Sequence, residues 1–349
     1  MRIKVGSFLG TGGNTDISGV GFQPIFVVCK NRTTSGQDGR LKMASMGLFT
    51  VNIATGDYFN TSITAFTSDG FSITSDFTNG DTYDYLALAA GGSLEDIAQG
   101  SFAGDGNDSR DITTDPDFQP DLVIIVIALN GTAHPYWRTD TFTADRTTRF
   151  EPVEAPTANL IQGFNSDGFE VGSDLNPNGF TQHYLALKKN NARFTTFEYT
   201  GNGVDDRNIT SLGFQPTFTM ICREAFEGAA VKFSGMDAAD TTGWNGGIFA
   251  DGIQSFLSNG IQVGTSTPVN ADTAVYNGWA LRDGTTTPGG GGGGQGGGQG
   301  GGGGNGGGNG GGNGGGGPPG GGGPPGQGNR KTIVGQRRRR RPALISGIF

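Results

Sequence analysis

The sequence contains very little cysteine or histidine. Only two of each occur among its 349 residues, so the side chains that most often bind metals or act as nucleophiles are scarce. Cys29 and Cys222 each lie inside an apolar run of residues. We therefore expect two buried thiols rather than a disulfide bond.

Neither histidine lies in a recognisable catalytic motif. His183 occupies a position that recurs elsewhere in the sequence as Asp84 and Asn277, which indicates a strand residue rather than a general base. His134 lies in an expected loop with no serine or cysteine motif near it. The HExxH, paired CxxC, Walker and GxSxG signatures are all missing, so the sequence does not predict an enzyme.

The acidic residues show no spacing typical of metal ligands. Asp105, Asp108 and Asp111 could in principle gather a calcium ion, but their spacing matches no calcium loop. Asp205 and Asp206 raise the same possibility. Two carboxylates for glycoside hydrolysis would converge only in the fold, and no distinguishing acid cluster marks them. We expect no metal and no cofactor.

Long hydrophobic runs are also missing. The first ten residues, MRIKVGSFLG, lack the apolar core of a signal peptide. No run approaches the roughly 18 apolar residues that a membrane-spanning helix requires. We therefore expect synthesis in the cytoplasm without a signal peptide, and no insertion into a membrane.

Glycine is abundant, with 67 residues, and Thr, Asn, Asp and Phe are also frequent. This composition favours strands joined by tight turns over helices. A turn followed by an apolar run occurs three times, as GFQP-IFVVCK from 21, DFQP-DLVIIVIA from 117 and GFQP-TFTMICR from 213. The motif phenylalanines are each 96 residues apart, which indicates three copies of one unit.

Other elements recur in each copy in the same order. A turn that feeds an alternating strand occurs as SDGFSIT at 68–74, SDGFEVG at 166–172 and SNGIQVG at 258–264. Each copy closes on a further apolar strand, which occurs as DYLALA at 84–89, HYLALK at 183–188 and NGWALR at 277–282.

These patterns predict an all-β fold of three tandem, jelly-roll-like β-sandwiches. The continuous apolar runs after FQP are typical of strands that are covered on both faces. Each copy of about 95 residues is long enough to bury a small core of its own. The expected segments are sandwiches at 1–91, 92–190 and 191–284, a glycine-rich tether at 285–328 and a basic and apolar segment at 329–349.

The copies differ most between the FQP strand and the SDG turn, at 31–67, 129–165 and 224–257. A shared scaffold with private loops is a common way to build a binding surface. HPYWR and TTGWNGG each occur in a single copy. Tyr136, Trp137 and Trp244 are therefore candidates for stacking on sugar rings, with packing in the core as the alternative interpretation.

Residues 289–328 contain thirty glycines in forty positions, with only Gln, Asn and Pro between them. No packed core is possible for such a composition. As a free coil the tract would span roughly 35 Å, and fully extended it would approach ~120 Å. We expect a flexible tether.

The last residues carry a charge opposite to that of the rest of the chain. Residues 329–349 contain seven Lys and Arg and no acid, whereas the first 328 residues carry 17 basic and 32 acidic side chains, a net of −15. The acidic body would repel a phosphate backbone, which leaves the arginine run as the place for nucleic-acid binding. The apolar end PALISGIF is expected to dock on a partner. The expected docking residues are Arg337, Arg338, Arg339, Arg340, Arg341, Leu344, Ile345, Ile348 and Phe349.

The repeated pattern resembles a family of bacteriophage tail-fibre and minor virion proteins. The resemblance rests on the GFQP and SDGF motifs, covers residues 1–284, and is closest in the third copy at YTGNGVDDRNITSLGFQPTF. The family usually has a tryptophan–alanine pair in the closing strand, which only Trp279 keeps here. The resemblance implies a structural or host-recognition role in a phage particle, and it supplies no catalytic residues.

We therefore expect a non-enzymatic virion protein, a tail-fibre or surface-displayed host-recognition component that its C-terminal segment fixes to the particle. The expected partners are other virion proteins of the tail or capsid and a host surface glycan. One alternative is a capsid decoration protein without a receptor, and another is a virion protein whose arginine run binds nucleic acid. The assembly is open between a homotrimer and one chain whose three domains form a pseudo-threefold unit.

Overall fold

The computed structural model describes residues 1–34, 36–91, 96–127, 134–151, 154–190, 192–225, 228–238 and 240–284. In these ranges the chain forms 26 β-strands, two short 3-10 helices and one four-residue α-helix. The prediction of an all-β fold is therefore confirmed. The predicted tether and docking segment, at 285–349, lie outside the described residues.

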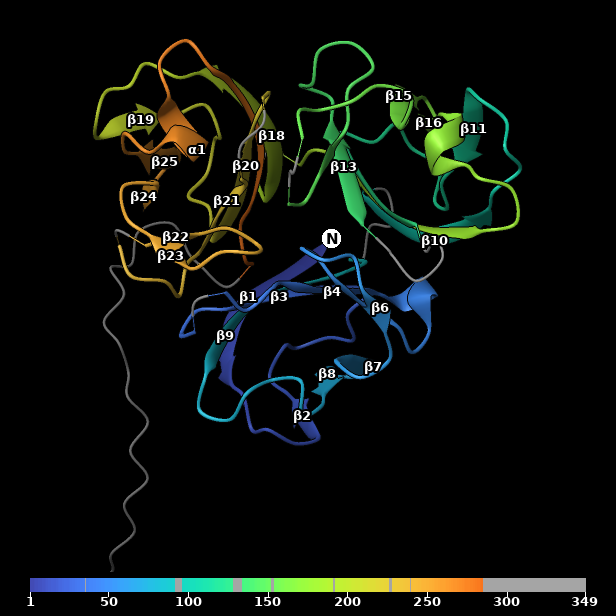
Figure 1. The fold of residues 1–349 in the computed structure, drawn as a ribbon, viewed down its shortest axis with the longest axis horizontal. Helices are drawn as coiled ribbons and strands as arrows, with labels where there is room; N and C mark the ends of the chain where they lie inside the picture. Colours follow the sequence, from blue (N-terminus) through green and yellow to red (C-terminus); the bar gives the residue numbers. More distant parts are fainter. Residues whose placement is uncertain are drawn as a thin grey trace, which may run out of the picture. The chain divides into compact units, whose positions relative to one another are not determined.

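The first sandwich consists of a larger and a smaller antiparallel sheet (Figure 1). The larger sheet has the order β1 (Arg2–Leu9), β9 (Thr82–Ala89), β3 (Phe26–Asn31), β4 (Arg40–Met43), β5 (Thr50–Asn52) and β6 (Tyr58–Phe59). The smaller sheet has the order β2 (Thr15–Ile17), β8 (Gly70–Ile73) and β7 (Ile63–Thr67). A 3-10 helix, η1 (Ala44–Met46), follows β4.

The second sandwich has the same strand order, with five strands instead of six in the described part of its larger sheet. Its larger sheet has the order β10 (Ile97–Ala103), β17 (Thr181–Leu187), β12 (Leu122–Ile127), β13 (Pro135–Thr139) and β14 (Thr148–Arg149). Its smaller sheet has the order β11 (Arg110–Thr113), β16 (Gly168–Val171) and β15 (Ile161–Asn165). The 3-10 helix η2 (Ser173–Leu175) follows β16.

The third sandwich repeats this order again. Its larger sheet has the order β18 (Phe194–Thr200), β26 (Val275–Leu281), β20 (Phe218–Arg223), β21 (Ala230–Phe233), β22 (Thr241–Thr242) and β23 (Ile248–Phe249). Its smaller sheet has the order β19 (Arg207–Ile209), β25 (Gly260–Val263) and β24 (Ile253–Leu257). The helix α1 (Thr267–Asn270) follows β25.

Each larger sheet is covered on both faces, which explains the continuous apolar runs. Along β3, Val27 and Cys29 pack with the smaller sheet of their own sandwich, while Phe26 and Val28 belong to a core that all three sandwiches share. This division follows from the two-residue period of a strand. All four side chains are at most 1% exposed.

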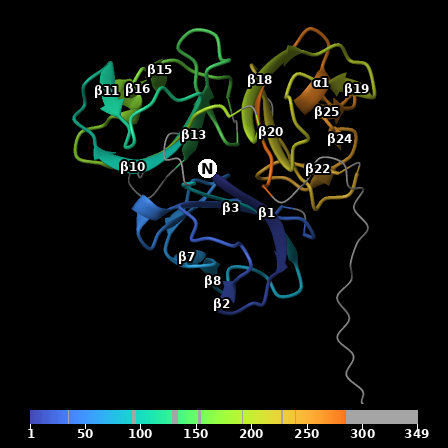
Figure 2. The ribbon, with the colours of Figure 1, turned by 180° about the vertical axis from the view of Figure 1, so that it is seen from behind.

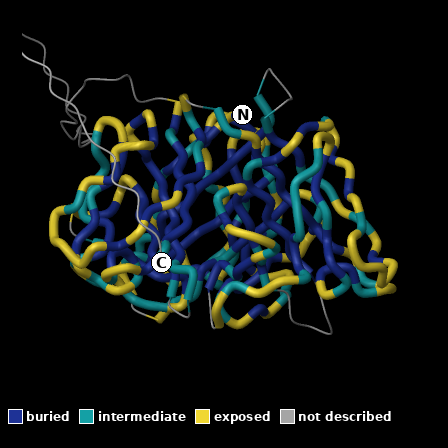
Figure 3. The backbone as a smooth tube through the Cα atoms, turned by 90° about the horizontal axis from the view of Figure 1, so that it is seen from above, coloured by how far each residue is buried: buried dark blue, intermediate teal, exposed yellow. Residues whose placement is uncertain are grey.

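The shared core joins the three sandwiches into one compact unit. The larger sheets turn toward one another and are called inner sheets here, whereas the smaller, outer sheets lie on the periphery (Figures 1 and 2). Buried residues accordingly run through the interior, and exposed residues gather on the peripheral loops (Figure 3). The strands that close each copy contribute Leu86, Leu88, Leu185, Leu187, Trp279 and Leu281 to the shared core.

The FQP glutamine attaches its turn to the outer sheet in the same way in each sandwich. Its side-chain amide donates to a backbone carbonyl at 3.1 Å, in the pairs Gln23–Phe66, Gln119–Phe164 and Gln215–Phe256. The motif therefore fixes the two sheets of a sandwich against each other at one end.

The glycine of the SDG turn packs directly against a backbone carbonyl. A Cβ atom would lie 1.8 to 2.0 Å from that oxygen in the pairs Gly70–Ile17, Gly168–Ile112 and Gly260–Ile209. A real Cβ cannot approach so closely, so the outer sheet requires glycine at this position.

Contacts between the sandwiches follow a cyclic order. In the first and second sandwiches, the loop that follows the fourth strand contacts the next sandwich along the chain. The same loop of the third sandwich contacts the first sandwich. The contacting pairs are Ser45 with His183 (3.0 Å), Asp140 with Thr196 (2.5 Å) and Gly235 with Arg32. Each interface joins two different surface patches, and the third interface leads back to the first sandwich, so the three sandwiches form a closed ring.

Candidate functional site

Two of the three aromatic residues that the sequence singled out lie in the shared core. Trp137 and Trp244 are both 0% exposed, and the Trp137 indole donates to the carbonyl of Arg149 at 3.1 Å. Neither ring has a face that a sugar could reach, because the shared core encloses both. Tyr136 is half-buried, and the guanidinium of Arg149 lies 5.5 Å from the centre of its ring. The structure does not bring the three residues together on a surface.

The cysteines and histidines occupy structural positions. Cys29 and Cys222 are free and buried, as expected, and burial raises the pKa of both thiols. His183 lies in strand β17, where burial lowers its pKa, and its Nδ1 meets the Ser45 hydroxyl of the first sandwich. His134 directly precedes β13, and burial lowers its pKa as well.

The aspartates that could have gathered calcium are held by neighbouring side chains. Asp108 accepts from Gln162 at 2.9 Å, and Asp111 accepts from Asn165. Asp105 accepts from Asn176 at 2.6 Å. Within the described ranges, no three His, Cys, Asp or Glu side chains converge as metal ligands would.

A buried polar junction joins all three sandwiches around the backbone of Trp244. Lys30 and the Gly39 N–H, both of the first sandwich, donate to the Trp244 carbonyl at 3.3 and 2.8 Å. Glu151 of the second sandwich accepts from the Trp244 N–H at 3.0 Å. Lys30 is 2% exposed and Glu151 is 5% exposed. The charged groups therefore hold the backbone of the third sandwich in place.

Both charged groups of this junction have shifted pKa values. Burial raises the pKa of Glu151 to about 7, against the opposing effect of the Trp244 N–H. Burial also lowers the pKa of Lys30 to about 8. Such shifts commonly mark functional sites. Here, however, the hydrogen bonds go to backbone groups of another sandwich, which assigns the junction to assembly.

A buried cation organises the loop after the fourth strand in each sandwich. Three residues pair with the strand that follows FQP in the same register: Lys42 with Val27, Arg138 with Val123 and Lys232 with Thr219. Their side chains donate to carbonyls of that loop: Lys42 to Gly47 and Phe49; Arg138 to Ala144 and Arg146; and Lys232 to Asp237, Ala238 and Asp240. Arg138 also donates to the carbonyl of Ile161, the first residue of β15.

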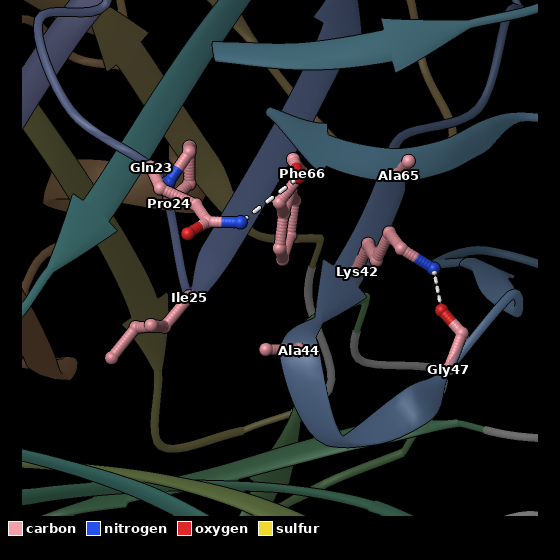
Figure 4. A pocket seen from close by; sticks show the side chains of 8 residues that line it. All are labelled: Gln23, Pro24, Ile25, Lys42, Ala44, Gly47, Ala65 and Phe66. Carbon is pink, nitrogen blue, oxygen red and sulfur yellow. Dashed lines mark hydrogen bonds between the residues drawn. The ribbon is translucent and has the colours of Figure 1, made fainter. Parts of the chain in front are cut away.

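A hollow of about 370 Å³ lies between the two sheets of the first sandwich (Figure 4). Lys42 extends along its wall toward the Gly47 carbonyl, and Gln23 reaches across to the carbonyl of Phe66. The remaining lining residues are Pro24, Ile25, Ala44 and Ala65. The hollow is thus mainly apolar, and its two polar side chains are already bonded to backbone.

A second hollow, of about 360 Å³, lies on the outer sheet of the first sandwich. Its lining is almost entirely polar and consists of Asn14, Thr15, Asp16, Thr64, Ser72, Ile73 and Thr74. The Ser72 hydroxyl donates to Asp16 at 2.6 Å. The side chain of Ile73, the one apolar lining residue, packs in the core between the two sheets. We call this site the outer-sheet hollow. Hydroxyl, amide and carboxylate groups side by side suit a hydroxyl-rich ligand better than an apolar one.

Sequence reasoning missed the outer-sheet hollow because its residues are small and unremarkable by themselves. The signal is comparative, since Thr64 stands where the other copies carry glutamine. Each of these residues lies at a bulge, between Ile63 and Ala65 in the first sandwich. The three residues align without a gap, each four positions before the serine of the SDG or SNG turn, but the sequence does not show that the glutamines reach Asp108 and Asp205 across the sheet. No family model matches the chain, and no curated protein is significantly similar to it.

Proposed function

We propose that the chain is a non-enzymatic structural protein of a bacteriophage virion. Its three sandwiches form a displayed head that recognises the host surface, and the basic and apolar C-terminal segment fixes that head to the tail or capsid. The proposal rests on the resemblance of the repeated GFQP and SDGF motifs. The cyclic order of contacts between the sandwiches is the structural observation that supports it most.

The cyclic contacts favour a self-sufficient head. A heterologous interface that closes after three units needs no further copy to satisfy it. Ser45, Asp140 and Gly235 occupy corresponding loops, and each contacts the neighbouring sandwich. One chain therefore supplies the arrangement that a homotrimer would otherwise provide. The outer sheets remain at the periphery, where a ligand can reach them.

The arrangement of the buried charged residues favours a structural role over catalysis. The pKa shifts of Glu151 and Lys30 are of the kind that functional residues show. Neither residue, however, lines the hollow between the two sheets of the first sandwich or the outer-sheet hollow. Their hydrogen bonds to the backbone of Trp244 hold sandwiches together. A capsid decoration protein without a receptor would share these features, and it would differ in lacking a ligand on the outer sheets.

The test is truncation of the chain after Gly284, followed by measurement of its incorporation into particles. We expect a folded, soluble head that no longer incorporates, because the docking residues have been removed. As a control, a chain with residues 289–328 shortened by half but with the terminal segment intact should still incorporate. Normal incorporation of the truncated chain would overturn the proposed anchor.

A further inference from the structure

The three outer sheets have the same register, including a β-bulge at the same place. The bulge lies between residues 63 and 65 in the first sandwich, between 161 and 163 in the second and between 253 and 255 in the third. The bulged residues are therefore Thr64, Gln162 and Gln254. A bulge redirects the side chain of its extra residue, so the outer faces can be compared through the contacts of these three residues.

In the second sandwich the bulged glutamine crosses the outer face as a bridge. Its Nε2 donates to Asp108 at 2.9 Å and to Asn159 at 3.2 Å. The third sandwich repeats both contacts, from Gln254 to Asp205 at 2.8 Å and to Asp251 at 3.2 Å. The two faces are thus closed by the same side-chain bridge.

The first sandwich lacks both the glutamine and the aspartate of this bridge. Thr64 is too short to cross the face, and Gly13 stands where the bridging aspartate would be. The correspondence follows from spacing, because Gly13, Asp108 and Asp205 each lie four residues before the isoleucine that pairs with the SDG strand. Ser72 also has a shorter side chain than Glu170 and Gln262, which occupy the corresponding positions in the other two outer sheets. These replacements leave the outer-sheet hollow.

Some groups around the hollow are free to take a ligand, whereas the Thr15 hydroxyl is paired with Thr11 and the Thr74 hydroxyl donates to the Thr61 carbonyl. Among the described residues, the Asn14 amide has no hydrogen-bond partner, and Asp16 accepts only from Ser72 at one of its oxygens. Thr64 makes only a long contact, 3.5 Å, to the Ser72 carbonyl. The hollow therefore offers the Asn14 amide, the second carboxylate oxygen of Asp16 and the Thr64 hydroxyl within one sheet face.

We propose that the outer-sheet hollow of the first sandwich binds a neutral saccharide ring. Saccharide hydroxyls both donate and accept, which matches the mixture of carboxylate, amide and hydroxyl groups here. The volume of about 360 Å³ lies at the small end of ligand pockets, which run roughly from 300 to 1,000 Å³. Asp16 repels a second carboxylate, so an acidic sugar binds more weakly. The assignment rests on the proposed role in host recognition and names its ligand class.

The second and third sandwiches suggest a variant that should block the hollow of the first. The double substitution Gly13→Asp and Thr64→Gln rebuilds in the first sandwich the bridge that closes the other two. A Cβ atom on Gly13 meets nothing within 4 Å, so the aspartate has room. The matched control is Asp205→Gly with Gln254→Thr, which makes the reverse change in the third sandwich and leaves the first hollow intact.

The experiment is an NMR titration of the full chain with the methyl glycosides of glucose, galactose, mannose and N-acetylglucosamine, and with glucuronate as the acidic counterpart. We expect at least one neutral glycoside to shift the backbone amides of residues 13–16 and 72–74. The G13D/T64Q variant should bind it at least tenfold more weakly, the D205G/Q254T control should bind it as the wild type does, and glucuronate should bind more weakly than the neutral sugars.

The saccharide assignment is overturned if no neutral glycoside shifts these amides, if the shifts lie elsewhere, or if G13D/T64Q binds as tightly as the wild type. Particles that carry G13D/T64Q should incorporate the protein normally and adsorb less to the host. Failure of glycoside binding together with loss of incorporation after truncation would reject this site and leave the virion role standing. Normal incorporation of the truncated chain would reject the virion anchor whatever the sugars do.

Discussion

Single residues in this protein are constrained most tightly where they touch backbone of another segment. The SDG glycines lie against an isoleucine carbonyl, with no space for a side chain. Trp137 and Trp244, for which the sequence leaves both sugar stacking and core packing open, are enclosed in the shared core where the three inner sheets meet. A tryptophan in a segment that differs between the copies is therefore a poor indicator of a binding site when the packing of the neighbouring sandwiches is unknown.

Glu151 provides a test at the scale of one residue. Burial raises its pKa from 4.5 to about 7, so the folded chain holds the proton more tightly than the unfolded chain does. Its favourable contribution is complete below about pH 4.5 and is lost as the pH rises through about 7. Glu151→Gln keeps an acceptor for the Trp244 N–H but cannot titrate.

We expect the free energy of unfolding of the wild type, relative to Glu151→Gln, to fall between pH 4.5 and pH 8. The fall should be up to about 3 kcal/mol, at about 1.4 kcal/mol for each unit of pKa shift. Urea unfolding of both proteins across this range measures it. Asp84, whose pKa burial raises to about 6, titrates in both proteins and cancels in the comparison. Parallel pH profiles would contradict the role given to Glu151.

At the scale of elements, the sequence predicts the repeated units well and their surroundings poorly. The strands after FQP, the SDG turns and the closing strands are visible because their apolar patterns recur in order. A continuous apolar run such as 122–127 shows that both faces are covered, but it does not tell which neighbour covers each face. The alignment of Thr64 with Gln162 can be read from their equal distance to the SDG turn, but the contact of Gln162 with Asp108, which Thr64 cannot make, appears only in the fold.

The loop after the fourth strand gives a test at this scale. Lys232 is 3% exposed and donates to three loop carbonyls, those of Asp237, Ala238 and Asp240. Lys232→Met removes three charge-assisted hydrogen bonds to a loop whose carbonyls lie in exposed or half-buried residues, so we expect a loss of about 1–3 kcal/mol in the free energy of unfolding. The exposed Lys188, changed to Met, is the control. Equal stability of the two variants in urea would refute the structural role of the buried cation.

At the scale of the whole molecule, the three sandwiches share a core and close on one another. Residues of all three inner sheets belong to one cluster, and the polar junction at Trp244 draws a side chain from each of the other two sandwiches. A unit of this kind should lose its structure as a whole, because unfolding any one sandwich exposes the inner faces of the other two.

The measurement that tests this most directly uses tryptophan fluorescence as a reporter on part of the chain. The three tryptophans, at 137, 244 and 279, all lie in the second and third sandwiches. Leu86 is 0% exposed and contributes to the shared core from the first sandwich. Leu86→Ala should cost about 2–5 kcal/mol, as is usual when a large core side chain is truncated.

In urea unfolding of the full chain, we predict one fluorescence transition for the wild type and one for Leu86→Ala, with the midpoint of the variant at a lower urea concentration. The shift would appear in tryptophans of sandwiches that carry no substitution, because the three unfold as one unit. An unchanged fluorescence midpoint, with a separate circular-dichroism transition for the first sandwich, would show that the sandwiches are independent and would contradict a single closed head.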